Sequence, residues 1–338
     1  REEVDTFSVG FELEEAEESD KFNQDFLLAR RTALHYGTTH HEVKLQTKEA
    51  VSLLEKAVSY MDEPVANPTS LAMLHLSQFV KPTATVVLTG DGGDELFGGY
   101  ERYRLSLWAD RYQKLPAGIR TMLNSHPRLR KLNTPPGVER VALFMFQKDA
   151  LLKRVLASEW VTNATADFFQ ANFLDSLQDP FTPQLMEVDR ETWLPDESLL
   201  RADKMAAASG VEARVPFLDP AVIGLADKIP FDQKVHGFDT KVILKEAFRG
   251  RLPEYLFAQP KRGWFSPAAK WLRRPLFIKA VDEILSPEYH PPTADLFIWP
   301  AIREMLNAHR EKREYNLTLI WILLTFQIWA KHYKISRT

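Results

Sequence analysis

The chain has 338 residues, enough for two domains or one large one, and its 45% hydrophobic and 26% charged residues are ordinary for a globular protein. The formal net charge of −3 gives no chain-wide electrostatic basis for nucleic-acid binding. The absence of cysteine excludes disulfides, thiolate zinc sites and a cysteine nucleophile in these residues. Nothing at the amino end resembles a signal peptide, and the apolar stretch 317–326 is too short to span a bilayer. We therefore expect a buried core helix over 317–326 and a cytoplasmic protein.

Strand and helix patterns alternate through the first hundred residues. The sequence predicts strands over 6–11, 40–45 and 83–89, and helices over 25–36, 47–61 and 70–80. Gly37 is the expected C-cap of the first of these helices, and Thr47 the expected N-cap of the second. This alternation is typical of a parallel sheet with helices on its faces.

After Tyr100 the strand signals fade. Helical patterns over 105–181 are interrupted by prolines, and further helices are expected over 197–209, 241–248, 268–272 and 315–332. We place the change from an α/β part to a helical part between residues 100 and 136.

The most informative stretch is TVVLTGDGGDELFGGY, residues 85–100. Its β-branched apolar run ends at a turn, residues 90–95, that contains three glycines and three carboxylates. A strand, a glycine turn and a helix in this order place a ligand at the carboxyl end of a parallel sheet. One carboxylate, Asp94 or Glu95, is explained if it caps the following helix, but three acids repel one another unless a cation holds them. The turn therefore predicts a Mg²⁺-nucleotide site.

Two further blocks carry charge along the chain. The helical run Arg201-Ala202-Asp203-Lys204 precedes an extended segment, 210–215, in which Glu212 and Arg214 alternate with apolar residues. Taken alone, these charges are better explained as a structural salt-bridge network than as a site.

The proline-bounded loop 259–267 contains Lys261 beside Arg262. Its basic pair is either solvated surface or, if the loop approaches a nucleotide, a source of charge that neutralises a phosphoryl group. The run His40-His41-Glu42 looks like a metal site, but adjacent residues in a strand point to opposite faces, so packing or surface roles are expected.

Together these blocks make the chain resemble the synthetase domain of the glutamine-dependent asparagine synthetases and their relatives. The resemblance runs from residues 6–11 and 37–42 through Asp62-Glu63-Pro64, the turn at 88–100 and Arg201-Ala202-Asp203-Lys204 to the block 210–219, and the Lys261 loop and residues 271–273 complete it. It implies an α/β fold with a parallel sheet of the adenine-nucleotide α-hydrolase-like (pyrophosphatase-loop) type and a helical C-terminal part. Residues 1–115 would be the ATP-binding core, and residues 116–338 would complete the active site.

The family's chemistry implies a role for each matching residue. ATP activates a carboxylate, aspartate in the type member, as an acyl-adenylate, and ammonia derived from glutamine then forms the amide and AMP. By position, Thr89 and Gly90 would contact ATP, and Val9 would meet the adenine through its backbone. Asp94 would help hold Mg²⁺, Asp91 would act in forming the acyl-adenylate, and Lys261 would stabilise the transition state.

Two parts of the family pattern are absent from the sequence. The Ser-Gly-Gly-x-Asp-Ser pyrophosphate loop does not occur, and only five residues precede the strand that begins at Thr6. The glutaminase domain, with its amino-terminal cysteine, does not occur either. We therefore expect that these residues alone hold pyrophosphate poorly, because such a loop supplies backbone donors to the phosphates.

Other functions compete with asparagine formation. Relatives that amidate surface sugars or secondary metabolites share these motifs, although Asp91 favours the amidating branch over the β-lactam branch. A pyrophosphatase-loop enzyme acting on a purine or a tRNA base is disfavoured by the block 210–219 and by the weak net charge. A non-catalytic fragment fits the absent loop but leaves the acids unexplained. We expect small-molecule substrates, no nucleic acid and no membrane; a homodimer is an expectation by analogy alone.

Overall fold

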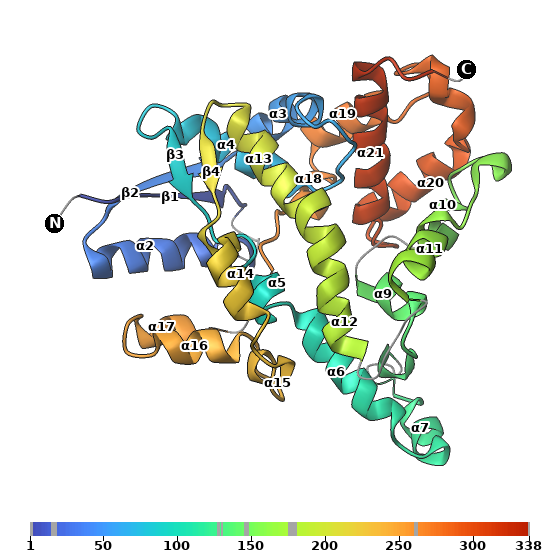
Figure 1. Ribbon diagram of the computed structural model, residues 1–338. Helices are drawn as coiled ribbons and strands as arrows, with labels where there is room; N and C mark the ends of the chain where they lie inside the picture. The colour runs from blue at the N-terminus through green and yellow to red at the C-terminus, as the bar shows by residue number, and fades with distance from the viewer. Residues whose placement is uncertain are drawn as a thin grey trace.

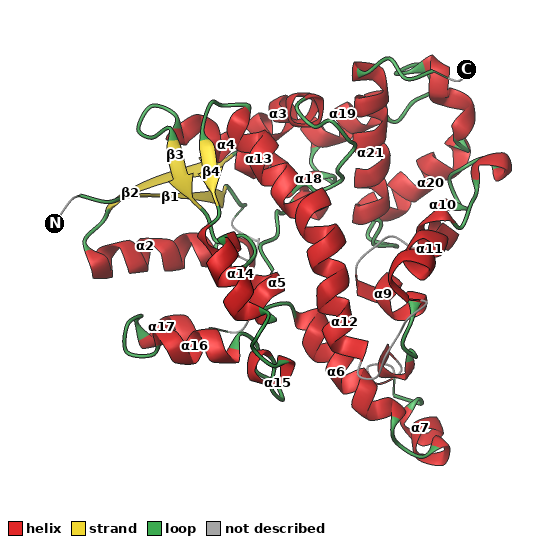
Figure 2. Ribbon diagram, in the orientation of Figure 1, coloured by secondary structure: helices red, strands yellow, loops and turns green. Residues whose placement is uncertain are grey.

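The computed structural model describes residues 3–14, 19–126, 129, 131–144, 149–174, 181–259 and 263–336. In these residues four strands form two parallel pairs, and helices make up most of the remaining structure (Figure 2). Strand β1 (Asp5–Phe11) pairs with β2 (Thr39–Leu45), and β3 (Val86–Leu88) pairs with β4 (Glu212–Arg214). The expected parallel pairing and mixed α/β class are confirmed. In the described part of the chain, however, the strands make two two-stranded sheets and not one continuous sheet.

The third strand is shorter than the predicted 83–89. The amides of Thr83 and Ala84 both donate to the Val80 carbonyl, at 2.9 and 3.0 Å, and so continue the turn that follows helix α4 (Thr69–Val80). These two residues are therefore occupied in ending a helix, and regular pairing begins only at Val86. The segment predicted to be extended after Gly210 is confirmed as β4.

Helices cover both faces of the β1–β2 pair (Figure 1). Helix α2 (Gln24–Tyr36) lies on one face, where a Cβ on Gly10 would come within 3.0 Å of the Phe26 ring. Helix α4 lies on the other, where Leu76 shares an apolar cluster with Phe7 of β1 and Val87 of β3. The alternating side chains of a strand thus serve two helix layers, as the β–α alternation predicts.

The two predicted helix caps have different outcomes. Gly37 ends α2 as expected, with φ 68° and its amide donating to the Ala33 carbonyl at 2.8 Å. The prediction for Thr47 is wrong, because Thr47 is the first residue of helix α3 (Thr47–Ser59) and Gln46 is the N-cap. The Gln46 amide donates to the Glu49 carboxylate at 3.0 Å, which satisfies a donor that a Thr47 cap would leave unpaired.

The second half of the described sequence is mostly helical and includes a π-helical segment over Asp189–Leu199. The helix bounds beyond those already given are α1 Ser19–Phe22, α5 Gly93–Phe97, α6 Glu101–Gln113, α7 Ala117–Leu123, α9 Val138–Phe144, α10 Asp149–Leu152, α11 Ala164–Phe169, α12 Phe181–Val188, α13 Leu200–Ala207, α14 Pro220–Ala226, α15 Phe231–Lys234, α16 Val242–Phe248, α17 Glu254–Phe257, α18 Ala268–Trp271, α19 Pro275–Ile284, α20 Trp299–Arg310 and α21 Leu317–His332. Helices α13, α16, α18 and α21 lie within predicted helical regions, whereas α14, α15, α17, α19 and α20 were not predicted.

The largest apolar core joins the first strands to the last helices. Phe11 and Leu45 of the β1–β2 pair share a buried cluster with Trp271 of α18 and with Ile320 and Leu324 of α21. The buried core helix expected over 317–326 is therefore confirmed, and no helix in the described ranges has the length and apolarity needed to cross a membrane. Residues far apart in the sequence are thus held in one body that fixes the position of β1.

Candidate active site

The turn after β3 presents exposed backbone. The Thr89 amide donates to the Arg214 carbonyl at 2.9 Å, which extends the β3–β4 pairing by one residue. Gly90 is exposed, and a Cβ added there would meet no atom within 4 Å. A ligand can therefore approach the main chain at Gly90 without obstruction.

The following glycines are required by close packing. Gly92 is the N-cap of α5 and has φ 84°, and a Cβ on it would lie 2.3 Å from Leu218 Cδ2. A Cβ on Gly99 would lie 1.7 Å from Asp94 Oδ1, inside any van der Waals contact. These glycines let the turn fold tightly over the carboxylates, so a side chain at either position would disrupt the site.

The three acids of the turn are kept apart by separate partners. Asp91 accepts hydrogen bonds from the Thr89 hydroxyl at 2.6 Å and the Ser198 hydroxyl at 3.3 Å. The Asp94 carboxylate lies 2.8 Å from the Lys241 ammonium. The N-cap of α5 is Gly92, and Asp94 and Glu95 lie inside the helix, so the alternative in which one of them is the N-cap is wrong.

The third acid, Glu95, is buried at 2% exposure and accepts a 2.5 Å hydrogen bond from the Tyr100 hydroxyl. Burial raises the pKa of Glu95, and the Tyr100 hydrogen bond opposes that rise. The Tyr100 hydroxyl also accepts from the Trp193 indole at 3.2 Å. A short polar chain thus ties α5 to the π-helical segment 189–199.

A buried ion pair lies next to these hydrogen-bonded side chains. Arg102 Nε donates to the fully buried Asp189 at 2.7 Å. The Arg102 guanidinium also lies 3.8 Å from the centre of the Tyr100 ring, within cation–π range. Burial raises the pKa of Asp189, and the adjacent Arg102 opposes the rise. Removing either charge would leave the other buried without its partner.

Lys241 and Ser198 are site residues that sequence reasoning missed. Lys241 adopts φ 52° just before α16, a left-handed conformation that is uncommon for a residue with a side chain. Ser198 reaches Asp91 from 107 residues away along the chain. No spacing pattern marks either residue, whereas Tyr100, five residues after Glu95, was within reach of a local analysis.

The remaining predicted residues have mixed outcomes. Val9 lies in β1 with its side chain buried and is aligned with Val43 of β2. Lys261 lies outside the described residues, so its position relative to the turn is untested. The described residues contain no group of three or more His, Asp or Glu side chains that would hold a metal ion by themselves.

The charged block 201–214 makes structural pairs. Arg201 pairs with Glu197 one turn earlier at 2.7 Å, and Arg214 pairs with Glu212 at 2.8 Å. Lys204 lies 2.7 Å from Asp62, which joins this block to the Asp62-Glu63-Pro64 motif.

The strand residues His40 and His41 point to opposite faces, as expected. His40 bonds to the Thr6 and Ser8 hydroxyls at 2.9 and 3.1 Å, and His41 bonds to Asp5 at 2.7 Å. The two rings therefore serve different neighbours.

Comparison with known proteins identifies the family of this chain. The model of the asparagine synthase family matches residues 1–331. The chain belongs to the asparagine synthase family. It is 29% identical over 336 residues to asparagine synthetase [glutamine-hydrolyzing] 1 of Bacillus subtilis, covering 96% of this chain and 51% of that protein.

Two other relatives extend the comparison. A putative asparagine synthetase [glutamine-hydrolyzing] of Mycobacterium tuberculosis is 29% identical over 339 residues, with 96% of this chain and 50% of that protein covered. Amidase chry2 of Gibberella zeae is 23% identical over 346 residues, with 92% and 51% covered. The asparagine synthase-family chain therefore spans about half the length of these curated relatives.

Proposed function

We propose that this chain is the synthetase part of an ATP-dependent amide-forming ligase. The carboxylate, most simply that of L-aspartate, is activated as an acyl-adenylate with release of pyrophosphate. Ammonia derived from glutamine then attacks the acyl carbon, which gives asparagine and AMP. The observation that carries the proposal is the open main chain at Gly90 with partnered carboxylates beside it, within a chain of this family.

The backbone is the proposed nucleotide contact. The Thr89 hydroxyl already donates to Asp91, so ATP would meet Thr89 and Gly90 through their main-chain groups. Val9 would likewise meet the adenine through its backbone, because its side chain is buried in the core. Backbone recognition of this kind needs rigid strands, which the parallel pairs β1–β2 and β3–β4 supply.

Asp91 is the proposed acid closest to the acyl group. Two hydroxyl donors fix its carboxylate, so it would enter adenylate formation in a defined orientation. Asp94 is the proposed Mg²⁺ ligand, since Mg²⁺ normally takes one or two protein carboxylates and completes its shell with water and phosphate oxygens. When bound, Mg²⁺ supplies charge that offsets the negative charge of the leaving pyrophosphate.

Two lysines have separate proposed roles. Lys241 orients Asp94 through their 2.8 Å ion pair. Lys261 stabilises the adenylation transition state by offsetting charge on the phosphoryl groups. We propose that residues 1–115 form the nucleotide-binding part and that residues 116–338 complete the site, with glutamine hydrolysis performed by a separate glutaminase domain.

A substrate panel on the full-length natural polypeptide tests the function. ATP with aspartate and ammonia should yield asparagine and AMP in equal amounts by mass spectrometry. The Lys261→Ala variant should slow AMP formation while leaving ATP binding within about twofold. The matched control is Lys228→Ala, which changes an exposed lysine that makes no ion pair in the described part of the chain. Formation of ADP in place of AMP would contradict an adenylate mechanism.

A second candidate is amidation of another carboxylate, such as a uronic acid of a surface sugar or a secondary metabolite. The similarity to amidase chry2 of Gibberella zeae favours keeping it. The same panel separates the two, because AMP release would then require the alternative carboxylate and would not occur with aspartate.

A further inference from the structure

A pocket lies between α19 and α20, remote from the turn after β3. Its volume is about 270 Å³, and Asp282, Leu285, Ser286 and Pro287 line it from the α19 side. Figure 1 shows α20 on the opposite side of α21 from β3 and β4. The pocket is therefore separate from the proposed nucleotide site.

One face of α20 supplies the other wall. Trp299, Arg303 and Asn307 follow one another at intervals of four residues and so lie along one side of the helix. The same three residues also line a neighbouring hollow, so the concave surface continues along α20. The floor is apolar, since Leu285 and Leu306 are buried.

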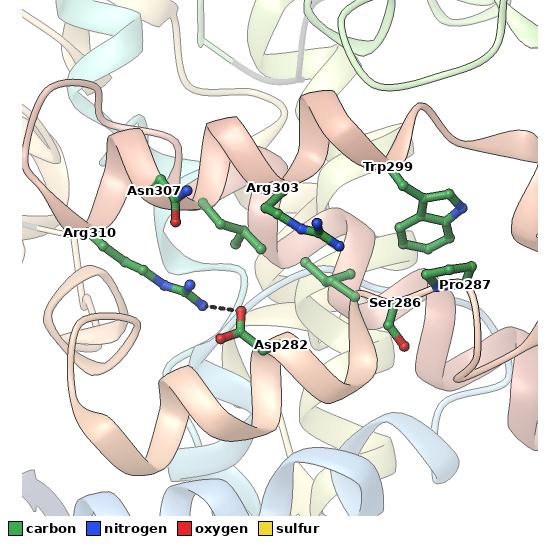
Figure 3. A pocket seen from close by; sticks show the side chains of 9 residues that line it. Asp282, Ser286, Pro287, Trp299, Arg303, Asn307 and Arg310 are labelled. Atoms are coloured by element: carbon green, nitrogen blue, oxygen red, sulfur yellow. Dashed lines mark hydrogen bonds and ion pairs between the residues drawn. The ribbon is translucent and has the colours of Figure 1, made fainter.

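The pocket has an excess of hydrogen-bond donors. Arg303 is exposed and has no ion-pair or hydrogen-bond partner in the described chain, and the Asn307 amide has none either. Arg310 donates to Asp282 at 2.6 Å through Nη2, while its Nε is buried and has no partner among the described residues. The unpartnered donors of Arg303 and Asn307 thus lie along the wall of one cavity, beside the Arg310–Asp282 pair (Figure 3).

The charges of the lining do not balance. The lining contains two guanidinium groups, those of Arg303 and Arg310, and a single carboxylate, Asp282, which pairs with Arg310. The next acid along α20, Glu304, lies 3.0 Å from Arg313 and is engaged there. The lining therefore carries one uncompensated positive charge, and a guanidinium fork is suited to a carboxylate or phosphate.

The apolar end of the pocket complements this charge. Figure 3 shows the Arg303 side chain extending toward the Trp299 ring, with Pro287 and Ser286 opposite. The Trp299 indole nitrogen donates to the Ala294 carbonyl at 2.8 Å and the centre of its ring lies 5.4 Å from that of the Phe297 ring, so the indole is held in place where it lines the pocket.

We propose that this pocket binds a small anion in which a carboxylate or phosphate is attached to a flat ring. The anionic group bonds to Arg303 and Asn307, and the ring packs against Trp299 over the leucine floor. A pocket with an apolar floor and a few polar donors has the general form of a small-molecule site, and its volume of about 270 Å³ restricts the occupant to a small ligand.

The test titrates the full chain, labelled with 5-fluorotryptophan, with benzoate and with phenyl phosphate, and uses neutral benzyl alcohol as control. The Trp299 resonance is assigned from Trp299→Phe and reports on this pocket alone. We expect a saturable shift with at least one anion and none with benzyl alcohol; the preferred anion identifies carboxylate or phosphate.

Variants decide whether the pocket is responsible. Arg303→Gln should weaken the preferred anion at least tenfold, and Arg111→Gln, which changes an exposed arginine on α6, should leave binding unchanged. No saturable Trp299 shift with either anion, or equal affinity in Arg303→Gln and the wild type, would overturn the proposal.

Discussion

Tyr100→Phe removes one hydroxyl from the centre of the polar chain that joins α5 to residues 189–199. The hydroxyl donates to Glu95 at 2.5 Å and accepts from the Trp193 indole at 3.2 Å. Phenylalanine fills the same volume, so the change deletes hydrogen bonds without creating a cavity. The almost fully buried Glu95 carboxyl and the Trp193 indole N–H each lose a hydrogen-bond partner.

The expected cost is about 2–3 kcal/mol of unfolding free energy at pH 7, since an orphaned buried group costs about 1–3 kcal/mol and Trp193 is only partly buried. Because the Tyr100 bond lowers the pKa of Glu95, its loss raises that pKa further. When the folded pKa of a carboxyl lies above its unfolded value, the protonated carboxyl carries no burial penalty. The free energy of unfolding of the protein then falls as the pH rises through the folded pKa and the buried group becomes charged. The difference between variant and wild type should therefore shrink as the pH falls toward 4.5, the ordinary pKa of the group.

Urea denaturation at pH 7 and near pH 4.5 measures both effects, provided that the chain remains folded at the lower pH. Tyr60→Phe, at an exposed tyrosine on the surface, is the control and should change stability by less than about 0.5 kcal/mol. The reasoning is refuted if Tyr100→Phe is as stable as the control variant at pH 7, or if its deficit grows as the pH falls.

Two further changes test the packing of the site and of the helical part. Gly99→Ala places a Cβ on the Asp94 carboxylate, so it should lower the free energy of unfolding by about 1–3 kcal/mol and abolish ligase activity. The control Gly224→Ala adds a Cβ that meets no atom within 4 Å inside α14, so it should raise the free energy of unfolding by about 0.5–1 kcal/mol in thermal denaturation. Arg140→Met leaves Asp110 buried without its ion pair and should cost about 3–5 kcal/mol in urea denaturation; a loss below 1 kcal/mol would contradict this assignment.

Local sequence signals predicted the β–α alternation well because each signal acts over a few residues. The left-handed glycine after α2 and the apolar run of β1 are of this kind, and both are confirmed. The Thr47 cap failed because Gln46 and Glu49 form a competing reciprocal pair that a preference for threonine ignores. The division into two strand pairs depends on how distant segments pack, which no local pattern records.

The same distinction applies to the site. The turn at residues 90–95 is a contiguous motif, so its glycines and acids were visible in the sequence. The partners that hold those acids, Lys241 and Ser198, come from segments more than 100 residues away and depend on an unusual backbone angle and a π-helical turn. Only the assembled fold brings them together.

The exchange of labelled pyrophosphate into ATP, measured on the full-length natural polypeptide with aspartate, tests the central claim most directly. Asp94→Asn should reduce the exchange rate at least about a hundredfold, a loss typical of removing a group that stabilises transition-state charge. Asp232→Asn, at an exposed aspartate of α15, should keep a rate within twofold of the wild type. Wild-type exchange in Asp94→Asn would contradict the assignment of this turn to the adenylating site.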